Sequence, residues 1–174
     1  MTPKQINVNS ADINSTRPLD PRLADMPLDV MGLFFFAYRD FVSAADELLA
    51  GHKFGRAHHR VLYFVNIRPG MPVANLLNIL KITKHSLARV LRQLIDEGYI
   101  EQHIGSEDRR QRLLFPTQKG KQFFALLSKS QTNLINDALQ SLPKDKQQIV
   151  RDFLLAMIEK TDHQTLAELQ LIEK

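Results

Sequence analysis

Basic and hydroxyl side chains that can donate hydrogen bonds gather in two short stretches of this sequence. Residues 83–96 have a helix pattern, and the side chains outside its apolar face include Lys84, His85, Ser86, Arg89 and Arg92. Residues 105–112 form a polar loop that carries three arginines, Arg109, Arg110 and Arg112. Such side chains donate hydrogen bonds to phosphate oxygens and to acceptor atoms on base edges. Their types and spacing predict binding of a nucleic acid.

The expected contacts differ between the two stretches. We expect His85, Ser86 and Arg89 to face base edges in the major groove, and Lys84 and Arg92 to contact phosphates. Arg109 or Arg110 is expected to enter the minor groove, and Arg112 belongs to the same predicted set. Taken alone, two arginines on a helix are more typical of a solvated face, and an Asp-Arg-Arg tip of a surface turn. Their order and spacing together favour contact with DNA.

The helix pattern has a defined start, face and end. The Thr83 hydroxyl can accept a hydrogen bond from a free backbone N–H at the helix start, and Gly98 is a typical stop. The apolar positions between them recur at helical spacing: Leu87, Val90, Leu91, Leu94 and Ile95.

After Gly98 the period changes to two. Residues 99–104 alternate as in a short strand, and a second apolar run at 113–115 is stopped by Pro116. A helix with a basic outer face, followed by a hairpin with a basic tip, predicts a winged helix. In that arrangement the helix fits the major groove, and the wing tip reaches phosphates or the adjacent minor groove.

The same residues carry a family resemblance. The chain contains, in order, HHRVLYFV, VANLLNILKIT, SLARVLRQLIDEGYI, EDRRQR and PTQKG. Over residues 54–120 these segments resemble the MarR family of bacterial transcription regulators, and the Asp108-Arg109-Arg110 and Thr117-x-x-Gly120 motifs are its most specific part. Pro116 departs from the leucine usual before that threonine, which leaves the end of the second wing strand open. The segments FFFAYRDF and FGRAHH resemble its alphaproteobacterial LdtR/PetP-like branch. The resemblance implies that Asp108 shapes the wing by pairing with an arginine.

Charge is concentrated where DNA contact is expected. Residues 52–121 hold 13 Lys and Arg against 5 Asp and Glu, whereas the segments before and after them are slightly acidic. That distribution is typical of a phosphate-binding surface. The chain has no cysteine, which excludes disulfides, thiolate nucleophiles and cysteine-based oxidant sensing.

No motif in the sequence indicates an enzyme. A Gly-x-Ser-x-Gly elbow, a glycine-rich phosphate loop and a His-Glu-x-x-His motif are all missing from the 174 residues. No cofactor is therefore expected. The sequence has no apolar run long enough to cross a bilayer and no signal-peptide pattern, so we expect a soluble cytoplasmic protein without membrane partners.

The remaining segments suggest the domain organisation of a mainly α protein with a small β-hairpin wing. Residues 1–26 form either an N-terminal arm or a disordered tail, and residues 27–53 a dimerisation helix that is apolar almost all round. Residues 54–120 form the winged helix-turn-helix. Residues 121–174 form C-terminal dimerisation helices, expected at 117–142, at 144–161 and, as a continuation, at 166–172. Their apolar stripes are expected to pack against the first helix and against its copy in a second subunit.

A small molecule is the expected regulatory signal, because the chain has no cysteine with which to sense oxidants. The family resemblance places effectors between the dimerisation helices and the winged helix, where the walls would carry Tyr38, Arg39, Phe41, His59 and Phe64. Such walls suit an aromatic phenol or acid that weakens DNA binding. His58 and His59 point about 100° apart on a helix and do not form a metal site together. Two alternatives stay open: a dimeric helical scaffold for an acidic protein partner, and a metal-responsive regulator.

Overall fold

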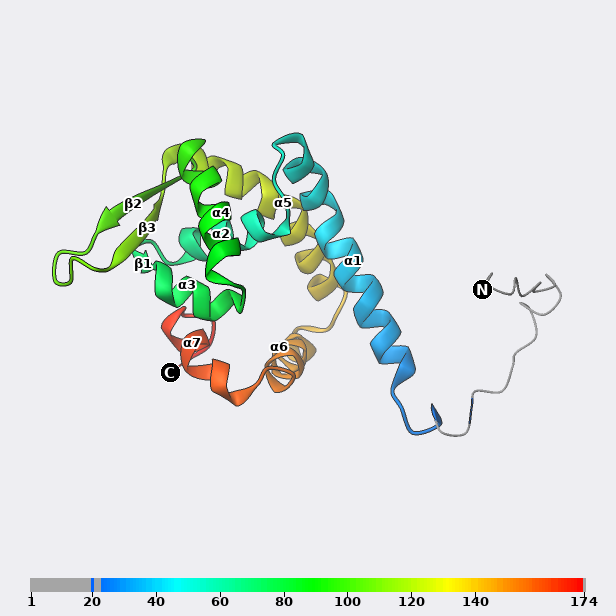
Figure 1. Ribbon diagram of the computed structural model, residues 1–174. Coiled ribbons are helices and arrows are strands. Elements are labelled where there is room, and N and C mark those ends of the chain that lie inside the picture. The colour runs from blue at the N-terminus through cyan, green and yellow to red at the C-terminus, as the bar shows by residue number, and fades with distance from the viewer. Residues whose placement is uncertain (1–19, 21–22, 174) are drawn as a thin grey trace, which may run out of the picture. The chain divides into compact units, whose positions relative to one another are not determined.

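The computed structural model describes residue 20 and residues 23–173 (Figure 1). Most of the expected N-terminal arm or tail, residues 1–19, 21 and 22, lies outside the described residues. The chain divides into two compact units, residues 1–38 and residues 39–174, which are taken separately below. Among the described residues, no helix has both the length and the apolar character needed to cross a membrane.

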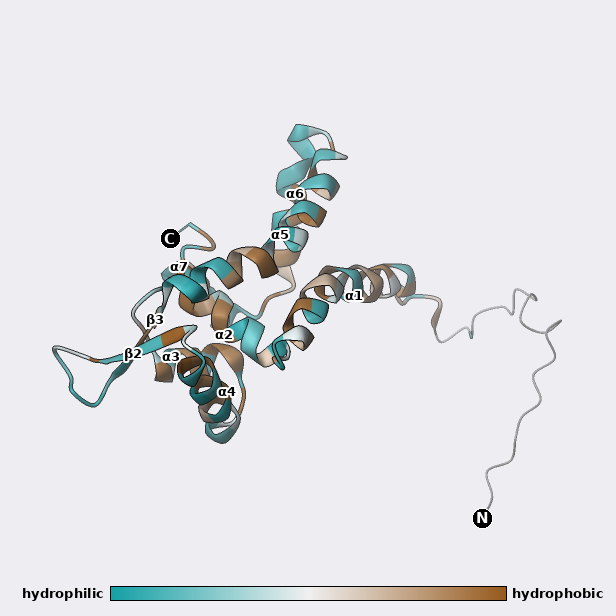
Figure 2. Ribbon diagram, turned by 90° about the horizontal axis from the view of Figure 1, so that it is seen from above, coloured by the Kyte–Doolittle hydropathy of each residue, from teal (hydrophilic) through white to brown (hydrophobic). Residues whose placement is uncertain are grey.

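The first unit contains the N-terminal part of α1 (Leu28–Gly51). The predicted aromatic run lies here, and its side chains are exposed: Leu33, Phe34, Phe35 and Phe36 are 49–69% accessible. Phe35 and Phe36 contact each other edge to face, with ring centroids 5.5 Å apart. Brown, hydrophobic segments recur along α1 in Figure 2. The sequence predicted that such a helix must be buried on most sides, and within one chain it is not.

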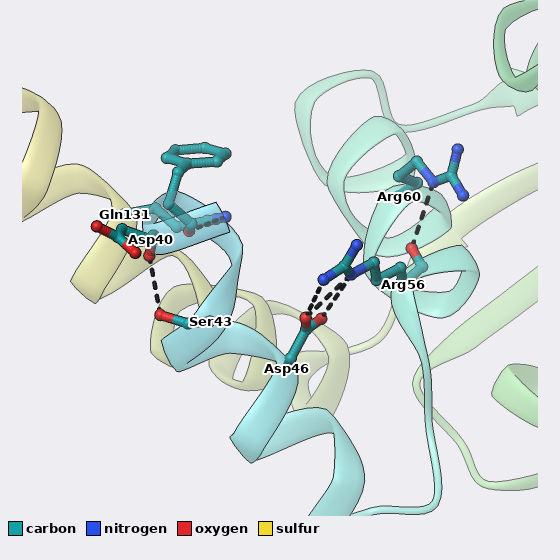
Figure 3. A network of polar contacts seen from close by, with 7 residues as sticks. Asp40, Ser43, Asp46, Arg56, Arg60 and Gln131 are labelled. Carbon is teal, nitrogen blue, oxygen red and sulfur yellow. Dashed lines mark hydrogen bonds and ion pairs between the residues drawn. The ribbon is translucent and has the colours of Figure 1, made fainter. Parts of the chain in front are cut away.

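The second unit begins with the C-terminal half of α1, which has one buried stripe. Val42, Ala45 and Leu49 recur at helical spacing and are at most 8% exposed. Asp46 accepts three hydrogen bonds from the Arg56 guanidinium, at 2.7, 2.9 and 3.3 Å, and so joins α1 to the start of α2 (Arg56–Ile67). Figure 3 shows this network, together with the Gln131 amide that donates to the Phe41 carbonyl oxygen at 3.1 Å.

The helix-turn-helix follows the predicted boundaries. The first of its two helices is α3 (Val73–Leu80), and the second is α4 (Lys84–Asp96), which we call the recognition helix. Lys81 makes the turn with a φ of 49°, in the left-handed region. The core beneath these helices consists of fully buried aliphatic side chains from α2, α3 and α4: Val61, Leu62, Val65, Leu76, Leu87 and Leu94.

A three-stranded antiparallel sheet in the order β1-β3-β2 forms the wing and its base. Its strands are β1 (Met71–Pro72), β2 (Ile100–Ile104) and β3 (Arg112–Pro116). Ile100 pairs with Pro116 and Ile104 with Arg112, so β3 ends at Pro116. The sequence missed β1, which is only two residues long. The β2–β3 hairpin projects away from α3 and α4 (Figure 1), and Ile100 is the only buried residue of β2.

The C-terminal region differs from the expected pair of long helices. It consists of α5 (Gln118–Gln140), η2 (Lys144–Lys146), α6 (Gln147–Ala156), η3 (Lys160–Asp162) and α7 (His163–Glu168). The predicted helix to residue 161 is wrong, because α6 ends at Ala156 and the chain turns. The predicted continuation at 166–172 is a separate helix, α7. The turn allows Leu169, which is 8% exposed, to enter the same core as the helix-turn-helix.

Candidate nucleic-acid interface

The outer face of α4 presents three of the residues predicted to contact DNA, two expected at base edges and Arg92 expected at a phosphate. His85, Arg89 and Arg92 are exposed and lie about one turn apart, opposite the buried Leu87 and Leu94. The start of the helix is fixed by Thr83, whose hydroxyl accepts a hydrogen bond from the Ser86 N–H at 3.1 Å.

Ser86 is placed less favourably for reading bases than its neighbours. It is half-buried, and its hydroxyl accepts a hydrogen bond from the Thr83 hydroxyl at 2.9 Å. The side chain therefore lies on the flank of α4 and contributes to the cap. Its own hydroxyl hydrogen remains available for one donated hydrogen bond.

Five cationic side chains of this surface have no partner within the described part of the chain. They are Lys84, Arg89, Arg92, Arg109 and Arg110, and neither a hydrogen bond nor an ion pair from another described residue engages their charged groups. Some cations elsewhere do have partners: Arg56 binds Asp46, and Lys119 donates to the Glu97 carbonyl oxygen at 2.8 Å. Unneutralised guanidinium and ammonium groups on one surface suit an external polyanion.

Backbone hydrogen bonds give the wing tip its shape. The Asp108 carboxylate accepts from the Arg110 N–H at 2.8 Å, and the Asp108 carbonyl oxygen accepts from the Gln111 N–H at 3.0 Å. This corrects the expected pairing of Asp108 with an arginine side chain, because its partner is a backbone N–H and no ion pair within residues 23–173 involves it. A Cβ at Gly105 would lie 2.7 Å from the Asp108 carbonyl oxygen, so the tip requires glycine there.

Arg112 differs from the other wing arginines. Its guanidinium donates to the carbonyl oxygens of Arg109, at 2.9 Å, and of Gln111, at 3.3 Å. The side chain thus supports the tip from the first residue of β3. Arg109 and Arg110 carry the unengaged charge of the wing.

The Thr117-x-x-Gly120 motif joins the wing base to α5. The Thr117 hydroxyl donates to the Gly98 carbonyl oxygen at 2.7 Å and accepts from the Gly120 N–H at 3.0 Å, and its N–H donates to the Tyr99 carbonyl oxygen at 3.1 Å. A Cβ on Gly120 would overlap that Tyr99 carbonyl. The motif therefore fixes where the hairpin leaves the helical core.

A contact that the sequence did not predict connects α2 to the recognition helix. His58 Nδ1 accepts from the Gly55 N–H at 3.1 Å, so Nε2 carries the proton and donates to Gln93 Oε1 at 3.0 Å. The His58 ring stacks on Phe54, with centroids 4.8 Å apart. Packing or pocket lining was the expectation for this histidine. Only the tertiary structure shows that it also positions Gln93 of α4.

The residues predicted to bind an effector do not line a described cavity. Arg39 pairs with Asp40 at 2.8 Å, Phe64 contacts Tyr63 edge to face, and Tyr38 lies in the first unit. His59 is half-buried; burial lowers its pKa below the ordinary value, and the nearby Asp46 opposes that shift.

Two cavities in the second unit lie elsewhere. One, of about 580 Å³, lies between α3, α4 and the wing, where Leu77, Leu91 and Arg112 contribute to its walls. The other, of about 550 Å³, lies between α3 and α7. Among the described residues, no group of three or more histidine or carboxylate side chains is placed to hold a metal ion.

Comparisons with known proteins agree with this arrangement. Residues 52–111 match the model of the MarR family. The chain is 47% identical over 97 residues to the HTH-type transcriptional regulator PetP of Rhodobacter capsulatus, a match that covers 56% of this chain and 58% of PetP. It is 26% identical over 95 residues to the uncharacterized HTH-type transcriptional regulator YybA of Bacillus subtilis, covering 53% of this chain and 63% of YybA. The matches thus span about three fifths of these relatives.

Solved structures show the same fold at low sequence identity. A MarR transcriptional regulator from Methanosarcina mazei superimposes with a TM-score of 0.60 at 22% identity, covering 75% of this chain and 94% of that one. A mutant MarR from E. coli, in complex with operator DNA, gives 0.59 at 18% identity, covering 80% and 99%. The fold is therefore a winged helix. The family match, the relatives and the fold agree: residues 52–111 are similar to the MarR family, and both matched relatives are named as HTH-type transcriptional regulators.

Proposed function

We propose that this protein regulates transcription as a homodimer that binds a pseudo-palindromic DNA site. One recognition helix from each subunit would enter successive major grooves about one helical turn apart. The wing arginines would reach the backbone or the minor groove beside them. Such a regulator works where the chromosome is, in the cytoplasm.

One observation carries the DNA-binding part of the proposal. The recognition helix and the wing tip together present five cationic side chains that no other described residue engages: Lys84, Arg89, Arg92, Arg109 and Arg110. The cap at Thr83, the buried face of α4 and the Thr117–Gly120 junction hold both elements in fixed positions. The E. coli MarR relative of the same fold is described as complexed with operator DNA.

Uncovered apolar side chains support the homodimer. In the first unit they are the aromatic residues of α1, 49–63% exposed. In the second unit α6 and its C-cap expose a stripe at helical spacing, with Ile149 57%, Phe153 48% and the capping Met157 54% exposed. Exposed apolar stripes on helices are typical of a subunit interface. A second copy of the chain supplies matching helices, because a two-fold interface uses the same patch on both subunits.

The effector part of the proposal needs the dimer. We infer that a small aromatic phenol or acid binds near Tyr38, Arg39, Phe41, His59 and Phe64 and weakens DNA binding. Neither described cavity uses these residues, so the second subunit would have to complete the site. The ligand would favour a spacing of recognition helices that does not match one DNA turn, and DNA and ligand would then oppose each other.

The DNA-binding part is tested by selecting bound fragments from sheared chromosomal DNA and measuring their affinity at two salt concentrations. We expect recurrent fragments with an inverted repeat, and affinity that falls steeply with salt. Binding that shows no preference among fragments and no salt dependence would contradict the proposal.

The assembly and the effector have separate tests. Sedimentation at micromolar concentration should give a dimer, and a stable monomer would exclude this part of the proposal. Phenolic acids are titrated by calorimetry into the free and the DNA-bound protein. A binder that attaches equally well to both forms would exclude release by the ligand.

A further inference from the structure

The C-terminal segment (residues 157–173) reaches the turn of the helix-turn-helix. Asp162 Oδ2 accepts a hydrogen bond from Lys81 Nζ at 2.9 Å, across 81 positions of the sequence. Lys81 occupies the left-handed turn between α3 and α4, two residues before the Thr83 cap of the recognition helix. Figure 1 shows α7 beside α3, as the cavity shared by the two helices also indicates.

Lys81 is placed where a helix-turn-helix passes over the DNA backbone. When the second helix of such a motif lies in the major groove, the first helix crosses the phosphates. The turn between them carries a lysine that is 60% exposed in its side chain. The hydrogen bond that Lys81 donates to Asp162, the negative charge of Asp162 and that of Glu159 raise the pKa of Lys81, so the side chain carries its charge at neutral pH.

The Asp162 side chain makes this ion pair instead of capping the start of α7. It stands at the N-cap of α7, where aspartate normally accepts a hydrogen bond from a backbone N–H of the first turn. Its carboxylate makes no such bond. The side chain extends to Lys81 instead, so the geometry favours the long-range ion pair over the local cap.

The C-terminal segment is held by few contacts. Beyond the ion pair, Leu169 enters the core, and the space between α7 and α3 is a cavity of about 550 Å³ and not a close-packed interface. Both members of the ion pair are substantially exposed, 60% and 40% in their side chains. An exposed pair is weak, and a closely spaced row of phosphates is a stronger partner for one ammonium group.

We propose that Lys81 is a further phosphate-contacting residue, and that Asp162 masks it in the free protein and yields it to DNA. This inference rests on the proposed function. The Asp162 carboxylate of the C-terminal segment competes with the DNA backbone for one cation at the turn before the recognition helix. Docking of that segment and binding of DNA therefore oppose each other.

The test is a double-mutant cycle on the full-length protein. The variants are Asp162→Asn, Lys81→Gln and both together, with Asp145→Asn as the matched control because it removes one exposed acidic charge from η2 of the same C-terminal region. Affinity is measured by fluorescence anisotropy on a random-sequence 30-bp duplex, since a phosphate contact is independent of sequence. A fragment selected from chromosomal DNA serves as the second probe.

We expect Asp162→Asn to tighten binding by about two- to five-fold at low salt, the range that an exposed ion pair spans. Lys81→Gln should weaken binding and lower the slope of log K against log salt by about 0.9. On the Lys81→Gln background, Asp162→Asn should give no gain beyond that of Asp145→Asn. Asp162→Glu, which keeps the charge, should bind as the unaltered protein does.

Each contrary result has one meaning. If Asp162→Asn binds no more tightly than Asp145→Asn, or if its gain survives Lys81→Gln, the masking is refuted. Thermal melts of each variant detect a loss of folding, and a folded Lys81→Gln with an unchanged salt slope would refute the phosphate contact. If the unaltered protein binds neither duplex, the proposed function itself fails and the masking with it.

Discussion

The recognition helix and the wing both present arginines that no other described residue engages, but different forces hold the two elements in place. The recognition helix is fixed by burial: Leu87, Val90, Leu91 and Leu94 are at most 6% exposed. The wing tip has no such core, and backbone hydrogen bonds around Asp108 give it its shape. A buried helix places its outer side chains rigidly enough to read base edges, whereas an exposed hairpin suits contacts that tolerate some displacement, such as those to phosphates. We therefore expect specificity from α4 and sequence-independent affinity from the wing.

The largest expected effect comes from the junction that the two elements share. Gly120→Ala places a methyl group onto the Tyr99 carbonyl oxygen, a backbone atom that cannot move aside. We expect a loss of more than about 3 kcal/mol in the free energy of unfolding, measured by urea denaturation. Gly51→Ala is the control, because nothing lies within 4 Å of its added Cβ. A melt of Gly120→Ala equal to that of the control would show that the junction is adaptable.

Removing an arginine from the helix should reduce specificity. Arg89→Ala should cost about 1–3 kcal/mol of binding free energy on a selected fragment and much less on random DNA. Arg151→Ala, an exposed arginine on α6, is the matched control. Equal weakening on both probes would assign Arg89 to the phosphates and remove the distinction drawn between helix and wing.

Removing the wing charges should change the salt dependence instead. Without Arg109 and Arg110, the slope of log K against log salt should fall by up to about 2, because fewer counterions leave the DNA on binding. The preference for a selected fragment over random DNA should change little. An unaltered slope would mean that the wing stays away from the DNA.

The smallest expected effect concerns the scaffold behind both elements. Burial lowers the pKa of His59, so the folded state favours the neutral ring. In the pH range just below the unfolded value of about 6.5, the unfolded chain binds more protons, and stability should fall as the pH falls through that range. Thermal melts between pH 7.5 and pH 5.5 measure this, and His59→Gln should flatten the dependence. An equally steep profile in His59→Gln would assign it to other groups.

Local signals in the sequence were sufficient for much of this surface. The Thr83 and Thr117 caps, the buried face of α4 and the bounds of α3 depend on residues close in the chain, and the structure confirms them. The cationic residues of α4 and the wing tip were also identifiable, because they lie outside the apolar face of a helix pattern or in a polar loop. Their roles on DNA remain predictions.

Features that depend on distant contacts were missed. The two-residue β1 forms only because Met71 pairs with Leu114, and α6 ends early while Leu169 returns to the core. The His58–Gln93 hydrogen bond spans 35 positions, and the role of Arg112 depends on the folded tip. No local pattern reports such pairings, since each depends on where another element has already packed.

The backbone at Lys81 has an evolutionary consequence. A φ of 49° suits glycine or asparagine, and a lysine there adopts a conformation that side chains with a Cβ disfavour. Lys81→Gly should therefore make the fold more stable while it removes the cation from the turn. Selection for stability alone would drift toward glycine at this position. If related sequences keep lysine at this position, the turn must need the positive charge. A comparison of related sequences at this one position therefore distinguishes selection for binding from selection for folding.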